Sequence, residues 1–125
     1  MGTVFALNTD GTGFKTLYNF TPGSAGGSEA RFILSGNTLY GTGGLVYSLS
    51  FRPQLTITPS GGYVIFTWPT NVAGFDYTGY TLESSTNLVP PAVWTAVSPG
   101  PVVIDGQNAV TNLISGTQQF YRLSQ

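Results

Sequence analysis

The sequence predicts an all-β protein, and two features of the chain indicate this class. Short segments with alternating apolar and polar residues recur, and Gly, Pro, Asn and Asp separate them. No window repeats apolar residues with the 3.6-residue period of an amphipathic helix, and the 17 glycines and 8 prolines interrupt every candidate. Many short strands joined by tight turns are typical of sandwich, barrel and propeller proteins.

The N-terminal part, residues 1–52, is expected to form a small propeller-blade-like β unit with a partial second repeat. Asp10-Gly11 is a strong hairpin signal, because these residues tolerate the positive φ angles of tight turns. A second hairpin is expected around Ser35-Gly36-Asn37. The strands predicted in this part cover residues 4–7, 14–20, 31–34, 38–42 and 44–52.

Two segments of this part resemble each other at an offset of 42 residues, from Gly2 to Gly44. Glycine, valine, an aromatic residue and leucine recur in register, which fits a blade or array unit of about 40 residues. A chance similarity of two short strands is the alternative. The aligned residues are Gly2, Thr3, Val4, Phe5, Ala6, Leu7 and Asn8 with Gly44, Leu45, Val46, Tyr47, Ser48, Leu49 and Ser50.

The remainder, residues 53–125, is expected to form a fibronectin-like or immunoglobulin-like β-sandwich. About seven short strands with turn signals every 8 to 12 residues are the pattern of this architecture. Trp68 and Trp94 are predicted core residues, and Tyr121 is predicted to be partly buried. The expected strands cover residues 55–57, 63–68, 80–84, 93–97, 102–104, 108–113 and 118–123.

The chain is unusually poor in charge, which limits the functions it can have. Only 7% of residues are charged and the net charge is −1, against roughly 25% charged residues in an average soluble domain. Four cationic side chains cannot neutralise a row of phosphates, so we expect no nucleic-acid partner. No apolar run approaches the roughly 20 residues that a membrane span needs.

Catalytic, metal and cofactor sites are not expected. The chain has no histidine and no cysteine, which excludes Ser-His-Asp and Cys-His catalysis and thiolate metal sites. Asp10 and Asp105 occur in Asp-Gly turns, where a turn role is the default. Residues 8–12 have a faint likeness to a calcium loop but lack its acidic ligands, so a plain hairpin turn is the favoured interpretation. We therefore expect a non-enzymatic protein.

Residues 2–14, 17–20 and 34–42 resemble the tandem repeats of large bacterial exported proteins, the choice-of-anchor proteins with a GloVer-type, propeller-like repeat. The C-terminal segments 80–88 and 120–123, with Trp94, look like the fibronectin-like domain that closes many such proteins. The resemblance implies an extracellular or cell-surface location in a bacterium and brings no catalytic residues. No signal peptide is visible after Met1, so we expect that one was removed or that the chain is a fragment.

A lone repeat predicts self-assembly. A blade-like unit of about 45 residues is too small to bury a sufficient core unaided, and in an array each unit covers its neighbour's apolar face. A strand of one copy would occupy the place of its equivalent in the next, pairing through residues 2–8 and 44–50. This contact is heterologous, so an open helical filament is favoured over a ring. Neither segment contains Lys, Arg, Asp, Glu or Pro to block edge pairing. A compact monomer is the alternative.

Carbohydrate binding is the second functional interpretation: an adhesive module of a larger exported protein that binds polysaccharide. Exposed aromatic rings stack on sugars, and a weakly charged surface suits a neutral ligand. The candidate residues are Tyr18, Tyr40, Phe75, Tyr77 and Tyr80, and residues 75–77 form the best loop-borne cluster. The competing interpretation is that these rings pack between strands.

Overall fold

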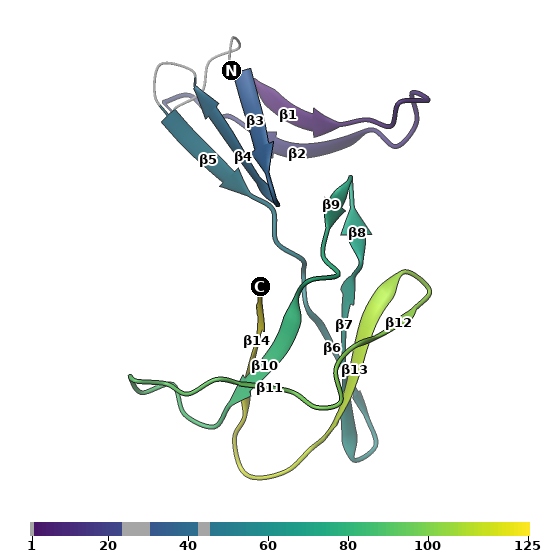
Figure 1. The fold of residues 1–125 in the computed structure, drawn as a ribbon, viewed down its shortest axis with the longest axis vertical. Helices are drawn as coiled ribbons and strands as arrows, with labels where there is room; N and C mark the ends of the chain where they lie inside the picture. Colours follow the sequence, from purple (N-terminus) through teal and green to yellow (C-terminus); the bar gives the residue numbers. More distant parts are fainter. Residues whose placement is uncertain (1, 24–30, 43–45) are drawn as a thin grey trace. The chain divides into compact units, whose positions relative to one another are not determined.

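The protein divides into two compact units. The structure, a computed structural model, describes residues 2–23, 31–42 and 46–125. Unit 1 contains Met1–Arg52 and Ala73–Phe75, and unit 2 contains Pro53–Val72 and Asp76–Gln125. Within the described ranges the chain forms strands and no helix, which confirms the all-β prediction (Figure 1).

Unit 1 is built from two antiparallel sheets, one with two strands and one with three. In the first, β1 pairs with β2, and the register shifts between Val4 and Phe5. In the second, β4 lies between β3 and β5. The described strands of this unit do not close a propeller. Their bounds are β1 (Thr3–Ala6), β2 (Lys15–Asn19), β3 (Arg31–Ser35), β4 (Thr38–Thr42) and β5 (Val46–Ser50).

A small aromatic cluster forms the interior of unit 1. Phe20 is buried next to Tyr47, with ring centroids 5.3 Å apart in an edge-to-face arrangement. Tyr47 in turn meets Phe32 at 6.2 Å, and Phe20 meets Tyr18 at 5.1 Å. Such edge-to-face pairs are favourable because the positive edge of one ring meets the negative face of the other. Phe20, which directly follows β2, therefore joins the β1–β2 hairpin to the three-stranded sheet.

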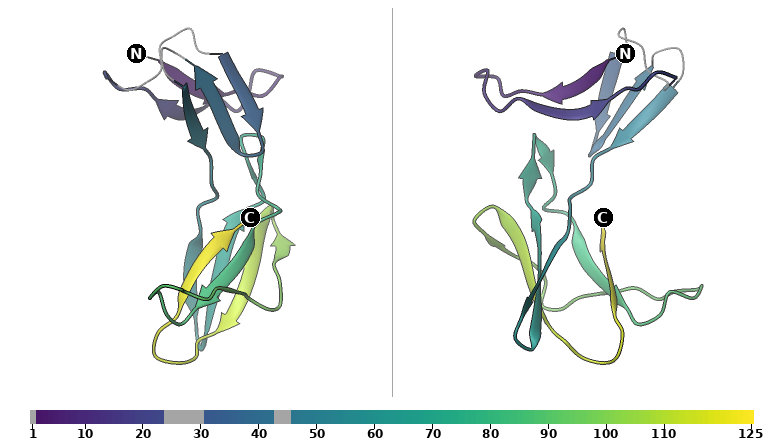
Figure 2. Two further views of the ribbon diagram at one scale, coloured as in Figure 1. Left: turned by 60° about the vertical axis from the view of Figure 1, so that its left-hand side comes forward. Right: turned by 180° about the vertical axis from the view of Figure 1, so that it is seen from behind.

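Unit 2 contains a four-stranded sheet of order β12-β13-β7-β6 and a three-stranded sheet of order β11-β10-β14. All pairs are antiparallel, and Figure 2 shows both sheets from two further sides. The strands are β6 (Thr56–Ser60), β7 (Tyr63–Pro69), β10 (Thr81–Ser85), β11 (Thr95–Ala96), β12 (Val102–Ile104), β13 (Gln107–Leu113) and β14 (Phe120–Ser124).

The two sheets of unit 2 enclose an apolar core. Phe66, Trp68 and Leu82 are its largest fully buried side chains. Phe66 of β7 meets Tyr121 of β14 with ring centroids 4.3 Å apart, so these two strands face each other. The buried position predicted for Trp68 is confirmed. Trp94, the other tryptophan predicted to be in the core, is only half-buried. The central carbon of the Arg122 guanidinium, Cζ, lies over the Trp94 ring, 4.3 Å from the ring centroid.

The turn residues act as the sequence indicates. Asp105 and Gly106 both have positive φ, 49° and 74°, in the two-residue connection between β12 and β13. A two-residue hairpin turn of this kind requires positive φ at both central positions, which Asp-Gly adopts readily. The expected hairpin around Gly36 is also present, since Ser35 pairs with Thr38.

One hairpin was not predicted. β8 (Asn71–Val72) and β9 (Phe75–Asp76) are joined by Ala73-Gly74, with φ of 53° and 86°. Alanine at positive φ is sterically disfavoured, so Ala-Gly is not a recognised turn signal. The hairpin therefore forms without a recognised turn signal in the sequence.

Candidate interaction surface

The open edge of β1 is the first feature of a candidate interaction surface. β1 pairs with β2 on one side, and no strand of the described chain pairs with its other side. Phe5 of β1 is 55% exposed, and Leu7, which follows the end of β1, is 50% exposed. Val4, the second residue of β1, is buried. Residues 2–8 carry no charge and no proline. This edge therefore has free backbone donors and acceptors beside exposed apolar side chains, the combination that favours strand addition.

The open edge of β5 is the second feature. β5 pairs with β4 alone among the described strands, and Val46 at its start is 81% exposed. Tyr47 and Leu49 are half-buried, so alternate residues face the interior. Gly44 and Leu45, which the sequence placed in this strand, lie outside the described residues. β1 and β5 belong to different sheets and are not paired with each other.

Unit 1 exposes much apolar surface around these edges. All five residues of β3 are exposed, and Ile33 is 71% exposed. Exposure of so many apolar side chains in one small unit favours a role in interaction. The large apolar side chains exposed in the described part of unit 1 are Phe5, Leu7, Phe14, Tyr18, Phe32, Ile33, Leu34, Tyr40 and Val46.

Of the five aromatic residues considered for sugar stacking, three are buried in the structure, whereas Tyr18 is 39% exposed and Tyr40 is 48% exposed. Phe75 is 6% exposed, Tyr77 is 3% and Tyr80 is 8%. Tyr77 and Tyr80 pack edge to face, with ring centroids 5.8 Å apart. Burial raises the pKa of the Tyr77 hydroxyl, because the ionised form loses its hydration. Rings arranged in this way present no open face to a sugar.

The carboxylates within the described residues act in turns and in one ion pair. Asp10 Oδ1 accepts hydrogen bonds from the Thr12 hydroxyl at 2.7 Å and the Thr12 backbone N–H at 2.9 Å. Asp76 Oδ1 accepts the same two bonds from Thr78. These bonds hold the pKa of both carboxyls below the usual range, since they favour the charged form.

Glu83 and Arg122 form an ion pair on the outward face of β10 and β14. Arg122 Nε donates to Glu83 Oε2 at 2.8 Å, and this bond lowers the pKa of the Glu83 carboxyl. Among the residues that the structure describes, no three acidic side chains gather in a group that could hold a metal ion. The described segments also contain no long apolar helix of the kind that spans a bilayer.

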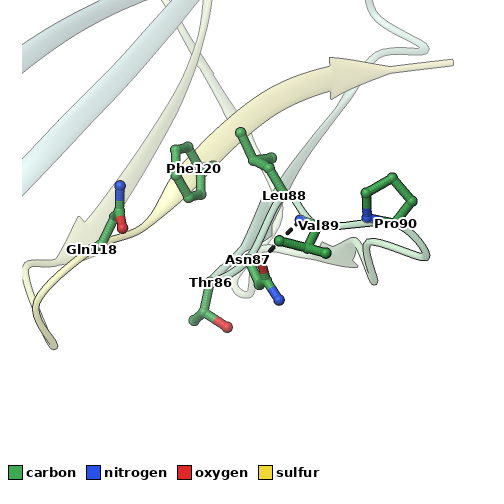
Figure 3. Close-up of a pocket in the computed structure, with 7 residues that line it drawn as sticks. All are labelled: Thr86, Asn87, Leu88, Val89, Pro90, Gln118 and Phe120. Atoms are coloured by element: carbon green, nitrogen blue, oxygen red, sulfur yellow. Dashed lines mark hydrogen bonds between the residues drawn. The ribbon is translucent and has the colours of Figure 1, made fainter.

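A shallow cavity of about 480 Å³ lies where the segment after β10 meets the start of β14 (Figure 3). Asn87 shapes it locally, because its Oδ1 accepts a hydrogen bond from the Val89 backbone N–H at 2.8 Å. Sequence reasoning missed this cavity, since its two walls are about 30 residues apart in the chain. It contains no titratable side chain to support chemistry. Its lining residues are Thr86, Asn87, Leu88, Val89, Pro90, Gln118 and Phe120.

Comparison of the chain with protein-family models, with curated proteins and with solved structures found no significant match.

Proposed function

We propose that this chain is an extracellular, non-enzymatic structural protein that assembles with copies of itself, into a filament or surface layer, by pairing β-strands between copies. The strands that take part are the two end strands of unit 1, in residues 2–8 and 44–50. The observation that carries the proposal is that β1 and β5 each pair on one side alone within the described chain and carry no charged residue.

The architecture proposed for the two units gives this pairing a physical reason. Unit 1 is a blade-like fragment, with sheets of two and three strands and a small aromatic core. In repeat arrays each unit covers its neighbour's apolar face, and unit 1 exposes such surface on β1, β3 and β5. Unit 2 is a fibronectin-like sandwich of four and three strands.

The low charge of the chain favours the same function. With 4 basic and 5 acidic residues in 125, copies repel one another weakly. Carbohydrate binding receives less support, because three of its five candidate residues, Phe75, Tyr77 and Tyr80, are buried. A contact between two different edges is heterologous. Repetition of such a contact builds an open filament, or a ring where the rotation between successive copies closes.

Light scattering at micromolar concentration, followed by electron microscopy, tests the proposal. The unmodified chain is expected to form large species that appear as filaments or layers. Phe5→Lys and Val46→Lys place a charge beside each open edge, and each is expected to raise the concentration needed for assembly at least about tenfold, because a buried unpaired charge is costly.

The matched control is Val93→Lys, which adds the same charge at a side chain that is 75% exposed between β10 and β11. This variant is expected to assemble like the unmodified chain. A strictly monomeric chain would contradict self-assembly. Assembly that is indifferent to both Phe5→Lys and Val46→Lys would show that these edges are not the contact.

A further inference from the structure

The open strand edges of the protein differ in how far they resist pairing with another chain. An edge strand exposes unpaired backbone donors and acceptors, and proteins block such edges with a charged side chain, with proline or with a very short strand. These three obstacles are distributed unevenly over the edges of this chain. Among the described strands, those with an open edge are β1, β2, β3, β5, β6, β8, β9, β11, β12 and β14.

In unit 1, the two edge strands that are not proposed to pair each begin with a basic residue. β2 begins with Lys15 and β3 begins with Arg31, and both residues are exposed. A strand added at either edge would remove part of the hydration of this charge without supplying an acidic partner. The obstacle matters most for β3, because Phe32, Ile33 and Leu34 are 42%, 71% and 56% exposed. The charge of Arg31, and not a lack of apolar surface, therefore separates β3 from β1 and β5.

The remaining edge strands of the described chain carry an obstacle as well. Pro59 lies in β6, and a proline in an edge strand leaves the open side without a donor at that position. β14 contains Arg122, and β12 has three residues and directly follows Pro101. β8, β9 and β11 have two residues each. Strands this short offer few main-chain hydrogen bonds to a second chain.

β1 and β5 lack all three obstacles. They have four and five residues, and neither strand includes a charged residue or a proline. No other edge strand of the described chain reaches four residues without a charge or a proline. The two edges at which the proposed function places the contact are therefore the two without an obstacle.

We infer that Lys15 and Arg31 determine the specificity of assembly, because they close the edges of β2 and β3 and leave β1 and β5 of unit 1 to pair with each other. The inference rests on the proposed function and adds which residues keep the other edges out of the contact. With two open edges in unit 1, each copy contacts one copy before it and one after it. The assembly then grows linearly and does not branch.

Replacement of Arg31 is expected to open a further contact of defined symmetry. In Arg31→Thr, β3 is uncharged throughout and keeps its exposed Ile33. Two copies of this strand can pair antiparallel about Ile33, so that the same surface of each copy contacts the other. Such an isologous contact closes after two copies. Where β1 and β5 are blocked, the variant is therefore expected to form dimers and no larger species.

Light scattering from a chain that carries both Phe5→Lys and Val46→Lys, called the blocked chain, tests the inference. The blocked chain is expected to be monomeric at micromolar concentration, with the 13.2 kDa mass of one chain. Addition of Arg31→Thr is expected to double this mass. The matched control is Arg52→Thr, which removes the same charge from an exposed position outside the strands. This control is expected to leave the blocked chain monomeric.

A blocked chain that stays monomeric with Arg31→Thr, or that dimerises equally with Arg52→Thr, would overturn the inference and leave the proposed function standing. If circular dichroism shows that Arg31→Thr does not fold, Arg31→Gln gives the same test. A monomeric unmodified chain would refute the proposed function. Dimerisation caused by Arg31→Thr would then still support the inference, and its absence would overturn it. A blocked chain that assembles without a further change would contradict both.

Discussion

The ring of Tyr47 lies against the backbone of Gly41 on the neighbouring strand. The two residues are directly opposite in the pairing of β4 with β5. A Cβ atom at residue 41 would lie 2.8 Å from Tyr47 Cζ and 3.1 Å from Phe32 Cδ1. Residue 41 is therefore glycine because two rings of the aromatic cluster occupy the space of a side chain.

This contact predicts the effect of Gly41→Ala. The added methyl group must displace Tyr47 or Phe32, and overpacking of this kind costs about 1–3 kcal/mol. The loss is expected in unit 1 and can be measured by urea unfolding followed through NMR signals of residues 31–42. Gly62→Ala is the matched control, because a Cβ there meets nothing within 4 Å. Equal stability of both variants would show that the rings do not rest on Gly41.

Two tyrosine hydroxyls differ in hydrogen bonding, and this predicts opposite effects of removing them. The Tyr47 hydroxyl oxygen is buried without a hydrogen-bond partner among the described residues. The Tyr121 hydroxyl accepts from Asn112 Nδ2 and donates to Gln119 Oε1, both at 2.9 Å. Tyr47→Phe is expected to stabilise unit 1 by about 1 kcal/mol, and Tyr121→Phe to destabilise unit 2 by about the same amount. Urea unfolding measures both, and a loss of stability in Tyr47→Phe would contradict the prediction.

The Asp10 turn predicts a pH dependence. The pKa of the Asp10 carboxyl is lowered mainly by the hydrogen bond from the Thr12 hydroxyl, and less by the one from the Thr12 N–H. Because the folded value lies below the unfolded one, the ionised carboxylate stabilises the fold above the unfolded pKa. This contribution is lost as pH falls through the lower, folded pKa. NMR titration should therefore place the Asp10 midpoint below the ordinary 3.8.

Replacement of the donor tests the cause of this shift. Thr12→Val removes the hydroxyl and keeps the N–H, so the pKa of Asp10 should rise part of the way toward its ordinary value. Thr78→Val is the control, since it removes the hydroxyl that bonds to Asp76 and leaves Asp10 untouched. An Asp10 midpoint that does not move in Thr12→Val would assign the shift to another cause.

Assembly is predicted to be insensitive to salt. Residues 2–8 and 44–50, which are proposed to pair between copies, contain no charged residue, and the chain has a net charge of −1. Raising the ionic strength from about 0.05 M to about 1 M shortens the Debye length several-fold and weakens surface ion pairs. Light scattering across this range should show assembly unchanged or strengthened. Dissociation at high salt would indicate that ion pairs hold the copies together.

The sequence alone determined the class of the fold and most of its strands. Alternation of apolar and polar residues is a local property, because successive side chains of a strand point to opposite faces. Turn pairs such as Asp105-Gly106 are equally local, since they depend on the φ angles that two residues tolerate. The scarcity of charge, and with it the expectation of a protein without catalytic or nucleic-acid sites, also follows from the residues themselves.

Only the tertiary structure decided which strand edges and apolar residues remain uncovered. Ile57 and Phe66 look alike in the sequence, and one is exposed while the other is buried because β14 covers β7 and stops short of β6. The place of Gly41 beneath Tyr47 likewise depends on a residue of a neighbouring strand. Sheet order sets these features, and sheet order is a long-range property that no local pattern encodes.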